Sequence, residues 1–141
     1  MNKAPNMNIS LDEKLTYFIN SKSGYARTKK EVKARAFAPT SGSPNELSVY
    51  RISSLTKSEI WEIGRKYVEG KIKIKARADF SASIFYENPF FLERNIKVVP
   101  DPHPHELHAN IIPIPTIIED RDEIFGELAL FCELVMRPEN L

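Results

Sequence analysis

The chain has 141 residues, 42% of them hydrophobic and 28% charged, and its 20 Lys+Arg nearly balance its 19 Asp+Glu. This composition is typical of one soluble globular domain and argues against disorder along the whole chain. The single cysteine, Cys132, excludes an internal disulfide, no apolar run is as long as a membrane span, and the start of the chain lacks the apolar core of a signal peptide. We therefore expect a cytoplasmic protein with no membrane partner.

The first ten residues show no periodic apolar pattern, so we expect a flexible tail at 1–10 and a single globular domain at 11–141. Residues 11–20 combine helix-like spacing with a run of residues that favours a strand, and both interpretations stay open there. Alternation and β-branched content predict strands near residues 31–38, 47–53, 71–80, 95–99 and 108–112.

The sequence predicts two helices. Thr56–Glu59 is a capping box that indicates a helix at about 57–69. Its apolar stripe consists of Ile60, Ile63, Gly64, Tyr67 and Val68. The second helix is expected at about 121–136, where apolar residues occupy more than one face and Pro138 stops the helix. These elements indicate an α+β domain: a small, mostly antiparallel sheet of four to six strands with both helices packed on one face.

The near-neutral composition conceals a polarised chain. Residues 1–77 carry 16 Lys+Arg and 7 Asp+Glu, whereas residues 78–141 carry 4 and 12. Such asymmetry indicates either an anionic partner for the first half or the docking of one half on the other, and the sequence leaves both interpretations open.

The alternation in two candidate strands predicts a cationic surface on the sheet. Its expected members are Lys33, Arg35, Lys71, Lys73, Lys75 and Arg77. Phosphates are the natural partner for such a surface, and Phe37 or Tyr25 would stack on a base, which indicates nucleic-acid or nucleotide binding. Lysines along a solvated strand explain the same pattern without any ligand, and this alternative also stays open.

His108 lies where a proline-rich loop meets a predicted strand, a suitable place for a general acid or base at neutral pH. Arg51 lies beside apolar residues on an inner strand, so it needs either a buried carboxylate such as Asp79 or an anionic ligand. Asp79 in the same way needs a positively charged partner. These three residues are the candidate catalytic group, and a purely structural role is the alternative for each of them.

The three histidines, His103, His105 and His108, are close enough in sequence to suggest a transition-metal site. Known sites of this kind usually add a ligand from a distant element, and prolines flank these histidines. We therefore favour an exposed loop for His103 and His105 and expect no metal or other cofactor. Cys132 is expected to be a small core residue and not a nucleophile.

Three stretches, SVYRISSLTKSEIWEIGRKYV, KARADFSAS and DPHPHELHANI, resemble a widespread group of small, uncharacterised bacterial proteins. That group has an S-V-aromatic-R strand, an E-I-W-x-I-G helix, an A-R-A-D segment and an H-A-x-I strand after a D-P-x-P loop. The resemblance covers roughly residues 33–115 and brings no chemistry with it. It implies only that the positions to test are Arg51, Trp61, Arg77, Asp79 and His108.

These features predict a domain that binds or acts on a phosphate-bearing ligand, either RNA or a nucleotide. Arg51, Arg77 and the lysines before it would hold phosphate, and His108 would be the acid or base. The size and class of the chain fit a protein of a toxin or phage-defence locus. The alternative is a non-enzymatic accessory protein that docks its basic half on an acidic protein partner, so the sequence leaves open whether the chain is an enzyme.

Overall fold

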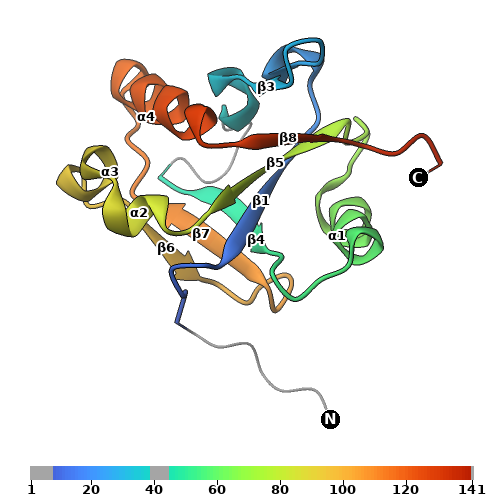
Figure 1. Ribbon diagram of the computed structural model, residues 1–141, viewed down its shortest axis with the longest axis horizontal. Coiled ribbons are helices and arrows are strands. Elements are labelled where there is room, and N and C mark those ends of the chain that lie inside the picture. The colour runs from blue at the N-terminus through green and yellow to red at the C-terminus, as the bar shows by residue number, and fades with distance from the viewer. Residues whose placement is uncertain (1–7, 39–44, 141) are drawn as a thin grey trace.

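The computed structural model of this protein describes residues 8–38 and 45–140 (Figure 1), so residues 1–7 of the predicted tail lie outside it. In the described residues, six strands form one antiparallel sheet in the order β6-β7-β4-β1-β5-β8. Their bounds are Lys14–Ile19 (β1), Leu47–Arg51 (β4), Ala76–Ser81 (β5), Lys97–Pro100 (β6), His108–Ile112 (β7) and Glu133–Met136 (β8). The short strands β2 (Tyr25–Ala26) and β3 (Glu31–Val32) pair separately.

Short helices and turns connect these strands. They are α1 (Lys57–Ile63), α2 (Ile84–Glu87), α3 (Pro89–Glu93), α4 (Ile118–Leu130), the 3₁₀ turns η1 (Lys22–Gly24) and η2 (Ala34–Phe37), and the π-helical turn η3 (Gly64–Val68). The arrangement confirms the predicted α+β class with a mostly antiparallel sheet. None of the helices in the described residues has the length and apolar character that crossing a membrane requires.

Both faces of the sheet carry apolar side chains, so the prediction that both main helices pack on one face is wrong. Strand β1 points Leu15 and Ile19 to one face and Phe18 to the other, because successive side chains of a strand alternate. Helices α2, α3 and α4 cover the first face, where Phe125 joins the core with Leu15. Helix α1 lies on the second face (Figure 1), where Trp61 packs against Phe18.

Helix α1 begins as the sequence predicts. The Thr56 hydroxyl accepts a hydrogen bond from the Glu59 backbone N–H at 3.2 Å, and the Glu59 carboxylate accepts one from the Thr56 N–H at 2.9 Å. The α-helix is regular only to Ile63 and then continues as η3. A Cβ atom at Gly64 would lie 2.7 Å from the Phe18 ring, so this glycine lets η3 pack directly on the sheet.

The single helix predicted at 121–136 is two elements. Helix α4 ends at Leu130, and the last four residues of the predicted helix form β8, which pairs with β5. The Phe131 N–H closes the helix on the Leu128 carbonyl at 3.0 Å. The apolar residues on more than one face of the predicted helix reflect this change from a helical to a strand period. A buried helix and a strand of the same sheet both need apolar residues.

The strand predicted at 31–38 is mostly irregular. Only β3 remains of it, and η2 follows. Ala36 and Phe37 are neighbours in sequence and both are buried, which the alternation of a half-buried strand does not allow. The strands predicted at 47–53, 95–99 and 108–112 correspond to β4, β6 and β7, and the undecided residues 11–20 contain β1.

The strand predicted at 71–80 begins only at Ala76. Immediately before it, the Lys75 N–H still donates to the Ile19 carbonyl at 2.8 Å. One residue earlier, the Ile74 N–H donates to the Glu69 carboxylate at 3.0 Å and not to a neighbouring strand. The ladder therefore stops at Lys75, and the lysines at 71 and 73 lie outside the sheet.

Candidate ligand-binding cleft

Arg51 lies at the end of β4, on the face of the sheet that α4 covers. Its Nε donates to Glu13 Oε1 at 2.7 Å, and its Nη2 donates to the Asn8 carbonyl at 3.5 Å. Only 8% of the Arg51 side chain and 11% of the Glu13 side chain are exposed. Arg51 therefore has the buried carboxylate that its position requires, but that partner is Glu13 and not Asp79.

Asp79 lies on the opposite face, in a second buried ion pair. The Arg77 Nε donates to both Asp79 oxygens, at 3.1 and 3.2 Å, and the Thr16 hydroxyl donates to Oδ1 at 2.6 Å. The Arg77 guanidinium also lies over the Trp61 ring, 5.0 Å from its centre. Arg51 and Asp79 face opposite ways because they pair with successive residues of β1.

His108 begins β7, and the proline-rich loop holds its ring. Its Nδ1 lies 2.9 Å from the Asp101 carbonyl oxygen and 3.6 Å from Asp101 Oδ2. Since a carbonyl can only accept a hydrogen bond, Nδ1 carries the hydrogen and Nε2 is the acceptor in the neutral ring. The Tyr50 ring lies edge-on at 5.3 Å. The structure thus gives His108 a fixed orientation, but it does not bring His108, Arg51 and Asp79 into one site.

His108 lines a cleft of about 550 Å³ whose lining draws on both faces of the sheet: Phe18, Tyr50 and Tyr67 belong to the core beside α1, and Tyr17 and Ala36 to the core beside α4. The floor comes from β1, β4 and β7, one wall from η2 and its neighbours, and the other from η3 and the loop before β7. The lining residues are Tyr17, Phe18, Asn20, Ser21, Arg35, Ala36, Ala38, Ser48, Tyr50, Tyr67, Val68, Pro104 and His108. A cleft of this size can enclose a small organic ligand.

The described lining of the cleft is aromatic and contains no carboxylate. Arg35 is its cation, and Lys66 lies close by, with its Nζ 5.6 Å from the centre of the Tyr67 ring. Burial raises the pKa of Tyr17 to about 12. Burial, with a smaller contribution from Tyr67, raises the pKa of Tyr50 to about 12. Both phenols therefore stay protonated at neutral pH and can donate hydrogen bonds.

The other two histidines have different surroundings. His105 Nδ1 accepts a hydrogen bond from the Leu107 N–H at 3.0 Å, and its ring lies 5.0 Å from that of Tyr67. His103 is exposed. Within residues 8–38 and 45–140, no group of three or more His, Cys, Asp or Glu side chains is arranged to hold a metal ion.

The six predicted phosphate-binding cations do not share a sheet face, so the predicted cationic sheet surface is wrong in its placement. Arg77 is buried in its ion pair with Asp79. The others lie outside the sheet: Lys33 and Arg35 at η2, and Lys71, Lys73 and Lys75 before β5. Of these six, Arg35 alone lines the cleft. Alternation predicted this surface, but five of the six residues are not in strands, and Arg77, which is in β5, is buried.

Sequence reasoning missed most of the cleft. It placed Tyr67 in the apolar stripe of a helix and gave Phe37 a stacking role, whereas Tyr67 lines the cleft and Phe37 is fully buried. The lone helical glycine before Tyr67 was the available signal, because it marks where the helix approaches the sheet. Ser48 and Pro104 carry no comparable signal, since their place in the cleft depends on strand pairing.

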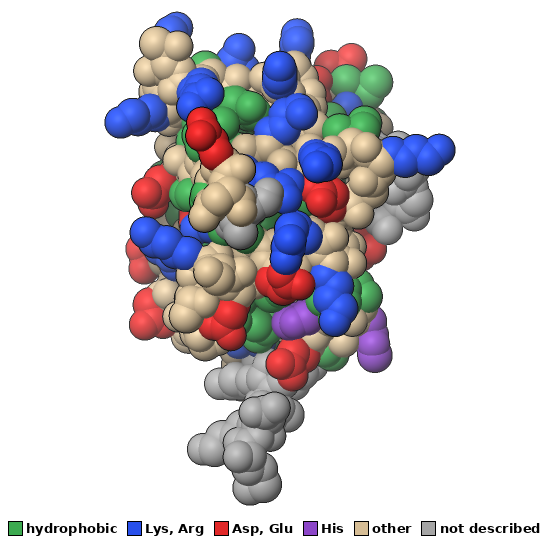
Figure 2. Space-filling model, turned by 90° about the vertical axis from the view of Figure 1, so that its right-hand side faces the viewer, with side chains coloured by type: hydrophobic (Ala, Val, Ile, Leu, Met, Phe, Trp, Pro, Cys, Tyr) green, Lys and Arg blue, Asp and Glu red, His purple; other side chains and the backbone are tan. Residues whose placement is uncertain are grey.

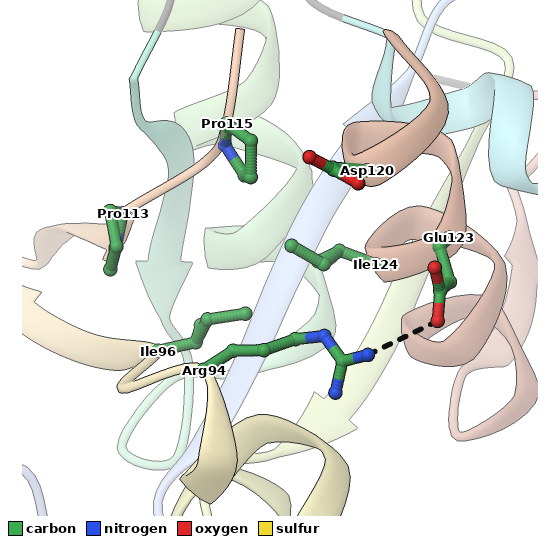
Figure 3. Close-up of a pocket in the computed structure, with 7 residues that line it drawn as sticks. All are labelled: Arg94, Ile96, Pro113, Pro115, Asp120, Glu123 and Ile124. Carbon is green, nitrogen blue, oxygen red and sulfur yellow. Dashed lines mark hydrogen bonds and ion pairs between the residues drawn. The ribbon is translucent and has the colours of Figure 1, made fainter. Parts of the chain in front are cut away.

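A second cavity, of about 260 Å³, lies between α4 and the chain around β6 and β7 (Figure 3) and shares no lining residue with the cleft. Its walls are Ile96, Pro113, Pro115, Ile124, Arg94, Asp120 and Glu123. The Arg94 Nη2 donates to Glu123 Oε1 at 3.1 Å, and Nη1 donates to the Phe90 carbonyl at 2.9 Å. Because its arginine is already neutralised, this cavity is the weaker candidate for an anionic ligand.

Comparisons with protein-family models, with curated proteins and with solved structures gave no match. The functional argument therefore rests on the geometry of the chain itself. Of the five positions that the sequence resemblance marks, Trp61, Arg77 and Asp79 form one contact group, Arg51 belongs to another ion pair, and His108 lines the cleft.

Proposed function

We propose that the cleft beside His108 binds a nucleotide or one nucleotide unit of RNA. The observation that carries this proposal is a lining with several aromatic rings, one arginine and, among its described residues, no carboxylate. A base stacks on aromatic rings, and a phosphate pairs with a guanidinium that donates two hydrogen bonds at once. Tyr67, which is half-buried, offers the ring, and Arg35 offers the guanidinium.

His108 adds a directional group to this site. Its Nδ1–H is engaged by the Asp101 carbonyl, and within the described residues no hydrogen bond engages its Nε2. Nε2 accepts a hydrogen bond from an N–H or O–H group of the ligand, and an imidazole nitrogen in this position can take a proton from, or return it to, a ligand hydroxyl. This is the acid or base role that we propose for His108.

The binding test is isothermal titration of the purified protein with AMP, CMP, GMP and UMP. We expect at least one of them to bind, and we expect Arg35→Gln to weaken binding about tenfold or more through loss of a charge-assisted hydrogen bond. Tyr67→Leu should weaken binding through loss of stacking, by about tenfold as well. The matched control is Arg94→Gln, which lies at the second cavity and not in the cleft and should bind like the parent protein.

Two results would contradict the binding proposal. One is the absence of binding by all four nucleotides at millimolar concentration. The other is binding that neither Arg35→Gln nor Tyr67→Leu changes, because the ligand would then lie elsewhere. Circular dichroism of each variant shows whether the fold is intact.

The proton role of His108 has its own test. In His108→Asn, the amide N–H can replace Nδ1–H towards the Asp101 carbonyl, but the proton acceptor is lost. We expect this variant to bind the ligand and to form no product when RNA or a nucleotide is incubated with it and analysed by chromatography. Product formation by His108→Asn equal to that of the parent protein would exclude His108 as the acid or base.

A non-enzymatic role remains the second candidate, and one observation favours it. Arg51, Arg77 and Asp79 are all engaged in buried ion pairs and do not line the cleft. Besides its tyrosines, the described lining of the cleft therefore has only His108 and Arg35 as ionisable groups, which is few for a catalytic site. In this reading, the basic half of the chain docks on an acidic protein. Nucleotide binding that depends on Arg35 separates the two candidates, because a protein-docking surface does not require it.

A further inference from the structure

Most of the positive charge of the described chain lies in two segments. Residues 20–35 and 64–75 together carry eleven Lys or Arg and two Glu. Ten of the eleven cations are exposed, and the eleventh, Lys75, is half-buried. One of the two carboxylates, Glu69, is paired with Arg137 at 2.6 Å. The two segments therefore present a strongly positive surface, which we call the basic end.

Strand pairing brings the two segments together. Strand β1 ends at Ile19, where residues 20–35 begin, and β5 begins at Ala76, opposite Ile19. The Lys75 N–H donates to the Ile19 carbonyl at 2.8 Å, so both segments leave the sheet at the same end. Figure 2 shows this side of the molecule, with lysine and arginine side chains gathered over its upper half.

The cleft opens at this same end of the sheet. Asn20, Ser21 and Arg35 belong to the first basic segment and also line the cleft, and Tyr67 and Val68 belong to the second segment and line it too. A ligand seated in the cleft is therefore continuous with the basic end. A free nucleotide, with one to three phosphates, leaves most of these cations without a partner.

We infer that the ligand is a single-stranded nucleic acid, with one nucleotide in the cleft and the following phosphates along the basic end. This inference rests on the proposed function. Aromatic rings that stack a base beside a groove of cations are how proteins bind single strands. A duplex would keep its bases stacked and out of the cleft, and an acidic protein would match the cations but has no base to place among the tyrosines.

The test is fluorescence anisotropy with labelled oligouridylates of two, four, eight and twelve nucleotides. We expect affinity to rise with length, because additional phosphates reach further cations. Lys71→Gln with Lys73→Gln should weaken binding of the eight-nucleotide strand at least fivefold and leave UMP binding unchanged. Affinity falls as salt rises, and each lost phosphate contact should reduce the steepness of log affinity against log salt by about 0.7. The double variant should therefore reduce the steepness by about 1.4.

The matched control is Lys14→Gln with Lys57→Gln, which removes the same charge from exposed lysines outside the two segments and should leave binding unchanged. Affinity that does not rise with length while UMP still binds would overturn this inference and leave the proposed function standing. Failure of every oligonucleotide and of all four mononucleotides would overturn both. Displacement of the oligonucleotide by polyglutamate of equal charge, with no effect of Tyr67→Leu, would overturn it in favour of an acidic protein partner.

Discussion

Among the described residues, four side chains with a formal charge at neutral pH are buried, and they form two separate ion pairs. Arg51 pairs with Glu13 on one face of the sheet, and Arg77 pairs with Asp79 on the other. Arg77 also lies over Trp61, whose ring packs on Phe18 in the floor of the cleft. These charges therefore have a structural role in the sheet and behind the floor of the cleft, and none of them lines the cleft.

Asp79→Asn is the sharpest test of this structural role. It leaves the buried Arg77 guanidinium without a carboxylate, and losing one partner of a buried pair costs about 3–5 kcal/mol. We expect a loss of that size in the free energy of unfolding, measured by urea denaturation. The control is Glu62→Gln in the exposed pair with Arg65, which should cost no more than about 1 kcal/mol.

Replacing both partners gives the complementary measurement. Arg77→Met combined with Asp79→Leu removes both buried charges, so it should destabilise the protein less than Asp79→Asn alone. A cost of Asp79→Asn below about 1 kcal/mol would mean that water solvates Arg77, and that the pair is not the buried interaction described above.

At the scale of elements, two helical glycines have opposite surroundings. A Cβ atom at Gly64 would lie 2.7 Å from Phe18, whose ring is itself packed against Tyr50 and Trp61. A Cβ atom at Gly126, in α4, would meet nothing within 4 Å. The first glycine is therefore required by packing, and the second is not.

Alanine substitutions should consequently have opposite signs. Gly64→Ala should destabilise the protein by about 1–3 kcal/mol through overpacking. Gly126→Ala should stabilise it by up to about 1 kcal/mol, because alanine is the better helix former. Thermal unfolding of the two variants checks both signs in one experiment, and a neutral Gly64→Ala would show that η3 can move away from the sheet.

The end of η3 is tied to the end of β8 by an ion pair. Glu69 accepts a hydrogen bond from Arg137 Nη1 at 2.6 Å and one from the Ile74 N–H at 3.0 Å. The bond from Arg137, followed by the backbone bond, holds the pKa of Glu69 below its ordinary value. The folded state therefore gains stability from the Glu69 carboxylate above the ordinary glutamate pKa, and loses it as the pH falls through the lowered pKa.

This sign predicts a pH-dependent effect of Glu69→Gln. The variant should be less stable than the parent protein at pH 7, and the difference should shrink as the pH is lowered below the ordinary glutamate value of about 4.3. Urea denaturation at pH 7 and at pH 3.5 measures it. The exposed Glu93→Gln on α3 is the control and should have a small effect at both pH values, and an equal cost of Glu69→Gln at both would contradict the assigned cause.

At the scale of the whole molecule, the formal charge of +1 conceals separated charges. The basic end carries most of the cations, whereas exposed carboxylates gather on α4, which packs against η2 of the basic end through Phe125 and Phe37. Among the described residues, no ion pair joins the basic end to α4. In the described part of the chain, the cations of the basic end are therefore not neutralised by ion pairs with the carboxylates of α4.

Cation-exchange chromatography at pH 7 should detect this separation. Lys71→Gln with Lys73→Gln and Lys14→Gln with Lys57→Gln have the same net charge, so a column that senses net charge would elute them together. The electrostatic potentials of clustered cations add at the protein surface, so removing two cations from the basic end weakens binding to the column more than removing two isolated ones. We therefore expect the first double variant to elute at lower salt than the second. Coincident elution would show that the basic end does not act as one surface.

The sequence alone determined what depends on neighbours along the chain. The capping box of α1 joins residues three apart, the apolar alternation of short segments gave the α+β class, and the charge asymmetry is carried over directly into the basic end. It also indicated that Arg51 and Asp79 need charged partners, and left open whether Arg51 finds a buried carboxylate or an anionic ligand. These properties survive because helix caps, side-chain periodicity and charge do not depend on which strands pair.

Only the tertiary structure decided which partners meet. A shift of one residue in strand register moves a side chain to the other face, so Arg51 pairs with Glu13, 38 residues away, and not with Asp79. The same register sets His108 beside Tyr50 and opens the cleft where β1 ends. The net charge of +1 and its asymmetry along the chain were fixed by the sequence, whereas the meeting of residues 20–35 and 64–75 in one basic end was fixed by strand pairing.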